Sequence, residues 1–262
     1  MKLISLNTWG GKFFDHFIQF VKEHKISTDI FCFQEIFSTT SSVKQFNSIL
    51  RANLLEELNA ILTDFRSFYF PTLEGFDVKA NKVDFDLLYG QAIFIKKVLK
   101  VNKYKNYFIY QDKSFKTLKK NFSNLSTPLQ YIQFTKDYKV FSIFNFHGTA
   151  HPAAKKDTPK RLEQSRKVKK IIDKTKGVKI LVGDFNLSMY TKSIDIFEKD
   201  LLNLTRKYDI ERTRSKLSPF FGKRNFQKFA DYAFVSPDVN VLNFEVPDIK
   251  ISDHLPMILE FS

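Results

Sequence analysis

The first part of the chain combines two apolar runs with one helical repeat. Residues 2–7 show the pattern of a strand, and residues 29–33 form the unbroken apolar run that is typical of a strand buried on both faces. Between them, the apolar residues of segment 13–24 recur at helical spacing. This order predicts a strand, a helix and a second strand, and both strands end in polar residues.

Further apolar segments predict strands along the rest of the chain. We expect them at residues 68–71, 89–95, 104–110, 129–134, 139–146, 178–182, 229–235, 239–246 and 255–261. The segments 129–134 and 139–146 form a predicted hairpin, whose turn is residues 135–138. Helical spacing predicts helices at residues 42–62, 159–175 and 193–204.

Polar and glycine-containing segments separate these elements. Gly177 is placed to end the helix expected before it. The polar segment 74–86 is expected as a loop near the functional site. Residues 113–127 are rich in Lys, Asn and Ser, and we expect either a loop or an edge hairpin there.

Helices separate only some of the predicted strands. That order favours two packed β-sheets flanked by helices over a doubly wound parallel sheet, so we predict an α/β fold. At 262 residues and 43% apolar content, the chain can bury a large core. It contains no repeat, low-complexity tract or Pro/Gly linker, and we expect residues 1–262 to form one domain and a monomer.

The chain is strongly basic, with 42 Lys and Arg against 28 Asp and Glu and a net charge of +14. Such a charge attracts polyanions, but a coding bias that enriches Lys together with the 30 Phe explains it equally well. The single cysteine, Cys32, lies in an apolar run and cannot form an internal disulfide. No apolar run approaches the roughly 20 residues that span a bilayer. We expect a cytoplasmic protein without stable membrane insertion.

Polar residues that follow or end apolar strands form the candidate site. They are Asn7, Glu35, Asn145, His147, Asp184, Asn186, Asp231, Asp253 and His254. A single aspartate at a strand end is usually a cap or turn residue. As a set they are hard to explain as caps, because burying carboxylates without a cation or other partner destabilises the fold. Asp184 and Asn186, two residues apart at a strand end, point to the same side.

Six motifs, in order, carry a resemblance to a known superfamily. They are the sequence LNTWG at residues 6–10, QE at 34–35, NFH at 145–147, GDFN at 183–186, DY at 231–232 and SDHLP at 252–256. Together they resemble the endonuclease/exonuclease/phosphatase superfamily, which includes deoxyribonuclease I, exonuclease III and neutral sphingomyelinases. The resemblance implies a four-layered α/β sandwich and divalent-metal-dependent hydrolysis of a phosphoester.

The metal-binding roles follow from that resemblance and from ligand chemistry. Glu35 supplies the hard oxygen ligand that Mg²⁺ or Mn²⁺ prefers. Asn7 is expected to touch either the metal shell or the Glu35 carboxylate. Asp253 is either a second metal ligand, which we favour, or a support for Asp184.

The catalytic roles concern the attacking water and the phosphate. Asp184 is expected to orient and deprotonate the water, and Asn186 to hold that water or a phosphate oxygen. His254 is expected to contact the phosphate. Asp231 resembles the histidine-orienting aspartate of the superfamily and would accept the other ring proton of His254 and favour its imidazolium form.

Other candidates lie around this centre. Asn145 and His147 are expected to bind the phosphate from the opposite side. Trp9 is expected to pack in the core, which we favour, or else to pack beneath the site or stack on substrate. A basic stretch comprises Lys155, Lys156, Lys160, Arg161 and Gln164, and a second patch comprises Arg212, Thr213 and Arg214. Each is either a phosphate clamp or a solvated surface, and we take Lys160 and Arg161 as the substrate contacts.

The sequence leaves the substrate open, because this fold hosts many activities. A nuclease or DNA-repair phosphodiesterase is the first hypothesis, supported by the charge and by alternating aromatic and basic residues at 104–108. The alternative is a phosphatase or a sphingomyelinase-like phosphodiesterase acting on an anionic lipid or inositol phosphate, although no amphipathic membrane helix stands out. A non-catalytic binding module is disfavoured because the catalytic positions are intact.

Overall fold

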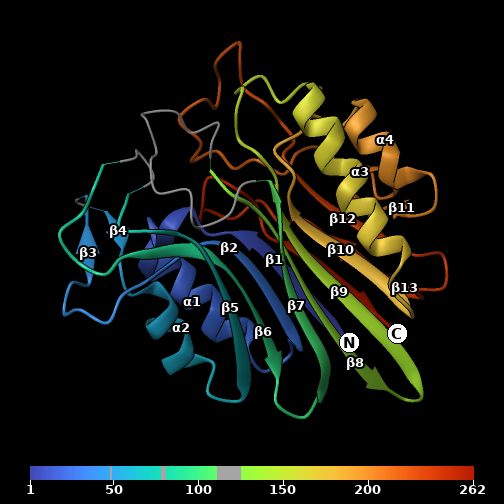
Figure 1. Cartoon of the computed structure of the whole chain (residues 1–262), viewed down its shortest axis with the longest axis horizontal. Helices are drawn as coiled ribbons and strands as arrows, with labels where there is room; N and C mark the ends of the chain where they lie inside the picture. Colours follow the sequence, from blue (N-terminus) through green and yellow to red (C-terminus); the bar gives the residue numbers. More distant parts are fainter. Residues whose placement is uncertain (48, 78–80, 111–124) are drawn as a thin grey trace.

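The computed structural model describes the whole chain except residues 48, 78–80 and 111–124 (Figure 1). Its strands form two six-stranded sheets and a small two-stranded sheet. The first large sheet has the order β13 (Val241–Glu245), β14 (Met257–Phe261), β1 (Lys2–Asn7), β2 (Ile30–Ser38), β6 (Leu88–Lys96) and β5 (Phe65–Glu74). The second has the order β11 (Leu202–Asn203), β12 (Asp231–Val235), β10 (Val178–Asp184), β9 (Lys139–His147), β8 (Thr127–Lys136) and β7 (Val101–Tyr110).

Both large sheets are mixed. β1 pairs in parallel with β2, and β9 pairs in parallel with β10, while the other pairs are antiparallel. The carboxyl ends of two parallel strands lie at the same edge of a sheet. Polar residues therefore lie together in each sheet: Asn7, which ends β1, is beside Gln34 within β2, and His147 and Asp184, which end β9 and β10, are beside each other.

Four layers result from the alternation of side chains along the strands. Leu3 and Ile180 belong to the core between the two sheets. Their neighbours Ile4 and Leu181 point to the opposite faces, where helices cover them. The helices α1 (Phe14–His24) and α2 (Leu54–Ile61) lie on one side, and α3 (Pro159–Asp173) and α4 (Lys192–Glu198) on the other (Figure 1). The predicted two-sheet sandwich is confirmed.

Local signals agree with several predicted boundaries. Thr158 accepts a hydrogen bond from the backbone of Arg161 at 3.2 Å and caps α3, which begins with proline. Gly177 follows the helix with φ at +84°. Asp137 and Tyr138 both have positive φ, which suits the tight turn predicted between β8 and β9.

The helix predicted at residues 42–62 is wrong over its first half. Its apolar residues lie instead on a short hairpin of β3 (Gln45–Phe46) and β4 (Leu50–Arg51), and only the last part forms α2. Phe46 and Leu50 pack against Phe37 in a satellite core. Upstream, Thr39 and Thr40 donate their hydroxyls to Asp86 at 2.6 and 2.5 Å. These contacts distant in sequence override the helical spacing.

The helix predicted at residues 193–204 is too long. α4 ends at Glu198, and the two-residue strand β11 precedes a new helix, α5 (Leu204–Lys207). Asn203 caps the start of α5, because its side chain accepts a hydrogen bond from the backbone of Arg206 at 3.3 Å. Most of the expected loop 113–127 lies outside the described residues, although Thr127 begins β8.

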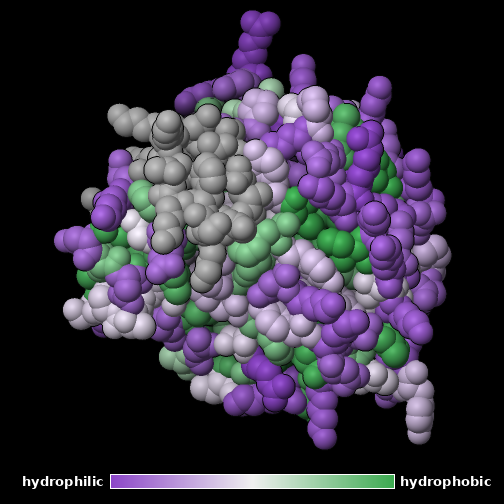
Figure 2. Space-filling view, viewed as in Figure 1, coloured by the Kyte–Doolittle hydropathy of each residue, from purple (hydrophilic) through white to green (hydrophobic). Residues whose placement is uncertain are grey.

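Hydrophilic side chains cover much of the face seen in Figure 2, with hydrophobic residues exposed in smaller groups. Among the described helices, none has the length and apolar character needed to cross a membrane.

Candidate functional site

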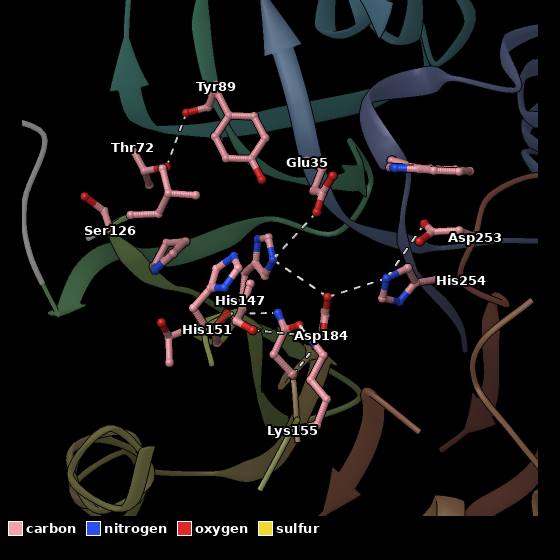
Figure 3. A pocket seen from close by; sticks show the side chains of 18 of the residues that line it. Glu35, Thr72, Tyr89, Ser126, His147, His151, Lys155, Asp184, Asp253 and His254 are labelled. Carbon is pink, nitrogen blue, oxygen red and sulfur yellow. Dashed lines mark hydrogen bonds and ion pairs between the residues drawn. The ribbon is translucent and has the colours of Figure 1, made fainter. Parts of the chain in front are cut away.

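The strand-end residues of both sheets meet in one pocket of about 280 Å³. Six of the nine strand-end candidates from the sequence line it: Glu35, His147, Asp184, Asn186, Asp253 and His254. Figure 3 shows His147 and His254 on either side of Asp184. The two sheets thus contribute to a single centre.

A bulge in β2 turns Glu35 into the pocket. The register of β2 against β6 shifts between Gln34 and Ile36, and Glu35 has φ at +59°, a region that side chains other than glycine rarely adopt. Glu35 therefore has no partner in β6, although its neighbours Gln34 and Ile36 do. Such backbone strain is typical of functional positions.

The GDFN turn is built around a buried aromatic ring and a glycine. Phe185 points away from the pocket and meets the rings of Phe146 and Tyr232 at 5.1 and 5.5 Å between centroids. Gly183 has φ at +138°, and a Cβ there would lie 2.0 Å from the carbonyl oxygen of Phe146. Anchoring Phe185 outward leaves Asp184 and Asn186 facing the pocket.

Asp184 is the centre of the site and is 2% exposed. Its Oδ2 lies 3.7 Å from Nε2 of His147 and 3.7 Å from Nε2 of His254. Its Oδ1 accepts a hydrogen bond from the backbone of Asn186 at 2.8 Å. Burial pushes the pKa of Asp184 upward, but the neighbouring His254 and His147 outweigh it and hold the pKa below its ordinary value.

Glu35 shares this centre with two other carboxylates. Burial raises its pKa to about 7, and the negative charges of Asp253 and Asp184 act in the same direction. Oδ1 of Asp253 is buried and has no hydrogen-bond partner among the described residues. Crowded carboxylates with an unpartnered oxygen fit a hard divalent cation. The residues present therefore suit the metal that the sequence implied.

Asn7 lies beneath these carboxylates. Its Nδ2 donates to Oε1 of Glu35 and to Oδ2 of Asp184, both at 3.0 Å, while its Oδ1 accepts from the backbone of Trp9 at 3.0 Å. Of the two expected roles, the contact with the Glu35 carboxylate is the one observed. The amide positions the acidic side chains.

His254 is held by Asp231 from β12. Nδ1 of the ring lies 2.9 and 2.8 Å from the two carboxylate oxygens. Nε2 lies 2.5 Å from Nη1 of Arg214, which can only donate, so Nε2 accepts and the ring proton lies on Nδ1. Burial lowers the pKa of His254 to about 4, and the charge of Arg214 adds to this effect. The imidazole is thus neutral in this arrangement, and the imidazolium expected from the sequence is wrong because burial and the charge of Arg214 disfavour it.

Two cations in the pocket were named in the sequence only as parts of basic patches. Arg214 also donates from Nη2 to Oδ2 of Asp253 at 2.6 Å. Lys155 donates to Oδ1 of Asn186, and burial lowers the pKa of its ammonium to about 8. Lys155 has φ at +54°, a backbone conformation that residues other than glycine rarely adopt, and its side chain lines the pocket. No spacing rule marked these two residues.

The profile of the endonuclease/exonuclease/phosphatase family matches residues 4–254, which is nearly the whole chain. The chain belongs to this family. Its members are phosphoester hydrolases, and the order of motifs along the sequence had implied the same assignment. No curated protein sequence matches the chain significantly.

Solved structures of the family share the fold. A family protein from Leptotrichia buccalis has a TM-score of 0.73 at 16% identity, with 100% of this chain and 99% of that chain covered. A mannosyl-6-phosphatase from Bacteroides thetaiotaomicron has a TM-score of 0.70 at 18% identity, with 100% and 99% covered. The human nocturnin catalytic domain with bound sulfate has a TM-score of 0.67 at 16% identity, with 100% and 94% covered. Identities this low show the fold alone.

Three expected phosphate contacts of this family member lie outside the pocket. Asn145 is buried between the sheets, where its Oδ1 accepts from Gln34 at 2.6 Å. Lys160 lies over the ring of Tyr110, with 3.6 Å between Nζ and the centroid. Arg161 is 1% exposed. None of the three lines the pocket.

The burial of Arg161 corrects its expected role as a phosphate clamp. Its guanidinium donates to the backbone carbonyls of Thr149, Ala150, Pro152 and Lys156 at 2.7–3.3 Å. By donating to these four carbonyls, the guanidinium of Arg161 stabilises one conformation of the loop that follows β9. The core packing favoured for Trp9 is not observed. Its side chain is only partly buried and lines the pocket.

Proposed function

We propose that this family member is a divalent-metal-dependent hydrolase of phosphodiesters in nucleic acid, acting in the cytoplasm. The observation that carries the proposal is the convergence on Asp184 of two imidazoles and of the carboxylates next to it. Burying so many titratable groups in one pocket costs stability unless they serve a bound ion or substrate.

Glu35 and Asp253 are the residues that would hold Mg²⁺ or Mn²⁺ in this proposal. Their oxygens are the hard ligands that these ions prefer. Asp184, Asp231 and His254 also offer atoms that lie within 4.8 Å of one another. Asp231 and His254 are already bonded to each other, so we assign the ion to the Glu35 side. When bound, the ion supplies positive charge to the phosphoryl oxygen and to the leaving oxygen.

Asp184 is the general base of the proposed reaction. Its low pKa keeps it ionised near neutral pH, and its carboxylate is oriented by Asn7 and the backbone of Asn186. It accepts a proton from water while the water oxygen forms a bond to phosphorus and the ester P–O bond breaks. The side chain of Asn186 is held by a hydrogen bond from its Nδ2 to the carbonyl of Gly148 at 3.0 Å. In this proposal its amide also contacts the attacking water.

The histidines and the two cations stabilise the phosphate. His254 is neutral and oriented by Asp231, and His147 lies 3.9 Å from Oε1 of Glu35 on the opposite side of Asp184. Arg214 and Lys155 supply donors and positive charge for the non-bridging oxygens. In this proposal a phosphate replaces the bonds that Arg214 makes with the site's own side chains.

The net charge of +14 supports a nucleic acid substrate, because neutralising phosphates is the main source of affinity for such partners. A phosphatase is the second candidate. The specific observation in its favour is the pair of cations in the pocket, Lys155 and Arg214, which suits the extra negative charge of a phosphomonoester. The similar structure from Bacteroides thetaiotaomicron is described as a mannosyl-6-phosphatase.

Hydrolysis assays separate the two candidates. The purified protein is incubated with Mg²⁺, Mn²⁺ or EDTA and with single-stranded DNA, plasmid, RNA, phosphorylated mannose or inositol phosphates. We expect metal-dependent cleavage of nucleic acid that EDTA abolishes. Faster release of phosphate from the monoesters than cleavage of every nucleic acid would establish the second candidate, and activity that is unaffected by EDTA would contradict the metal requirement.

A further inference from the structure

A second cavity of about 490 Å³ adjoins the catalytic pocket. Four residues line both spaces: Ala150, His151, Lys155 and Arg214. The two cations therefore lie at the boundary between the pocket and the cavity. A molecule whose phosphate sits against Lys155 and Arg214 has a direct route for the rest of its structure into the second cavity.

The lining of this cavity is mostly apolar and uncharged. Small side chains, Ala150, Ala153, Ala154 and Ala230, form much of its wall. Phe220 adds an aromatic ring that is 47% exposed. None of the described lining residues is acidic, and the positive charges are those at the boundary with the pocket. An uncharged group with a flat apolar face fits this chemistry.

Two amides add hydrogen-bonding groups. Gln227 is held in place, because its Oε1 accepts from Ser188 at 3.1 Å and its Nε2 donates to the carbonyl of Asn225 at 3.3 Å. Within the described part of the chain, no hydrogen bond engages the side-chain amide of Asn225. This amide offers a donor and an acceptor side by side, as the edge of a nucleobase does.

The wall of the cavity is fixed from behind. Nη2 of Arg161 donates to the carbonyls of Ala150 and Pro152 at 3.3 and 2.7 Å, which sets the path of the loop on one side. On the other side, Ser218 begins a turn in which its carbonyl accepts from the backbone of Phe221 at 2.9 Å. A subsite with a fixed wall loses less entropy on binding.

We propose that this cavity is a nucleoside subsite, in which one base of the substrate stacks on Phe220 while its phosphate lies between Lys155 and Arg214. The inference rests on the phosphate site of the proposed function and adds the chemical class of the group attached to that phosphate. It predicts that a nucleotide binds more tightly than a simple phosphate ester.

Calorimetric titration tests the subsite without turnover. All proteins carry Asp184→Asn, so that the ligand is not consumed, and the ligands are thymidine 5′-monophosphate and ribose 5-phosphate in the presence of Mg²⁺. We expect the nucleotide to bind about tenfold more tightly than the sugar phosphate, the size expected for one stacked base. Phe220→Ala is expected to remove that difference and to leave the affinity for ribose 5-phosphate unchanged.

Phe221→Ala is the matched control. Phe221 is the next residue and is 41% exposed, but it packs against Phe226 and does not line the cavity. It is expected to keep the preference for the nucleotide. Equal binding of the two ligands, or equal losses in the two phenylalanine variants, overturns the subsite and leaves the phosphate site standing. Failure of both ligands to bind contradicts the phosphate site as well.

Discussion

The side-chain amide of Asn7 donates a hydrogen bond to Asp184 at 3.0 Å, across 177 positions of the sequence. Asn7 ends β1 of one sheet, and Asp184 ends β10 of the other. The same amide nitrogen reaches Glu35 at 3.0 Å. One amide thus links the proposed general base to the proposed metal ligand, and the catalytic pocket lies where the two sheets meet.

Replacing Asp184 by asparagine removes the proposed base at almost constant volume. We expect turnover to fall on the order of 10²–10⁴-fold, the usual contribution of a positioned base. The melting temperature is expected to stay close to that of the parent, because the amide oxygen can still accept one of the two hydrogen bonds that the carboxylate accepts, and a buried charge is removed. Asp195→Asn on the exposed surface of α4 is the control. Near-normal turnover of Asp184→Asn would remove Asp184 from its role.

Asp231→Asn tests the orientation of His254. The amide can donate to Nδ1 and so favour the tautomer with its proton on Nε2, which then no longer accepts from Arg214. We expect the turnover of Asp231→Asn to fall on the order of 10²–10⁴-fold, and the turnover of His254→Ala to fall by a similar factor. Nitrogen chemical shifts of His254 report the tautomer. An unchanged tautomer together with full activity contradicts the pairing.

Glu35→Gln weakens the proposed metal site. The neutral amide keeps an oxygen but loses the charge that attracts a divalent cation. The Mg²⁺ concentration for half-maximal activity is expected to rise at least about tenfold. Activity is measured across a Mg²⁺ series, with Glu260→Gln, whose partner is Lys2 on the far end of β1, as the control. An unchanged Mg²⁺ requirement assigns the ion to other ligands.

Lys155 predicts an alkaline limit to activity. Burial lowers the pKa of its ammonium to about 8, with Arg214 and Arg161 acting in the same direction, so the positive charge is present below that pH and lost above it. We expect kcat/KM to fall as pH rises through about 8. Lys155→Arg retains the charge and is expected to move this limit to higher pH. The same limit in both proteins would show that another group titrates.

Arg161 is expected to act on stability. Arg161→Met leaves four backbone carbonyls without their donor, at a cost of about 2–4 kcal/mol in the free energy of unfolding. Urea denaturation measures the loss, and Lys156→Met, at an exposed neighbouring position, is expected to cause little change. Normal stability combined with a raised KM for Arg161→Met would instead support the phosphate clamp first expected from the sequence.

The two helices predicted too long show where local patterns are insufficient. Val43, Phe46 and Leu50 have a spacing that suits a helix, yet Phe46 and Leu50 belong to a hairpin that packs on Phe37. The helix predicted at 193–204 ends at Glu198, and Asn203 caps a separate helix, α5. Apolar spacing records which residues are buried, but a hairpin and a helix can bury the same residues.

The sequence by itself determined the strands of the two large sheets other than β11, the polar residues that follow them and the family, because a strand's apolar pattern and the side chain that follows it are neighbours along the chain. It marked Asp184, Asn186, His254 and Glu35 for that reason. Only the tertiary structure decided that Arg214 meets His254, that Lys155 enters the pocket and that Arg161 is buried. Arg214 and Lys155 lie on loops, and Arg161 lies in the first turn of α3 against such a loop. The path of a loop depends on contacts distant in sequence, so three similar basic side chains reached three different environments.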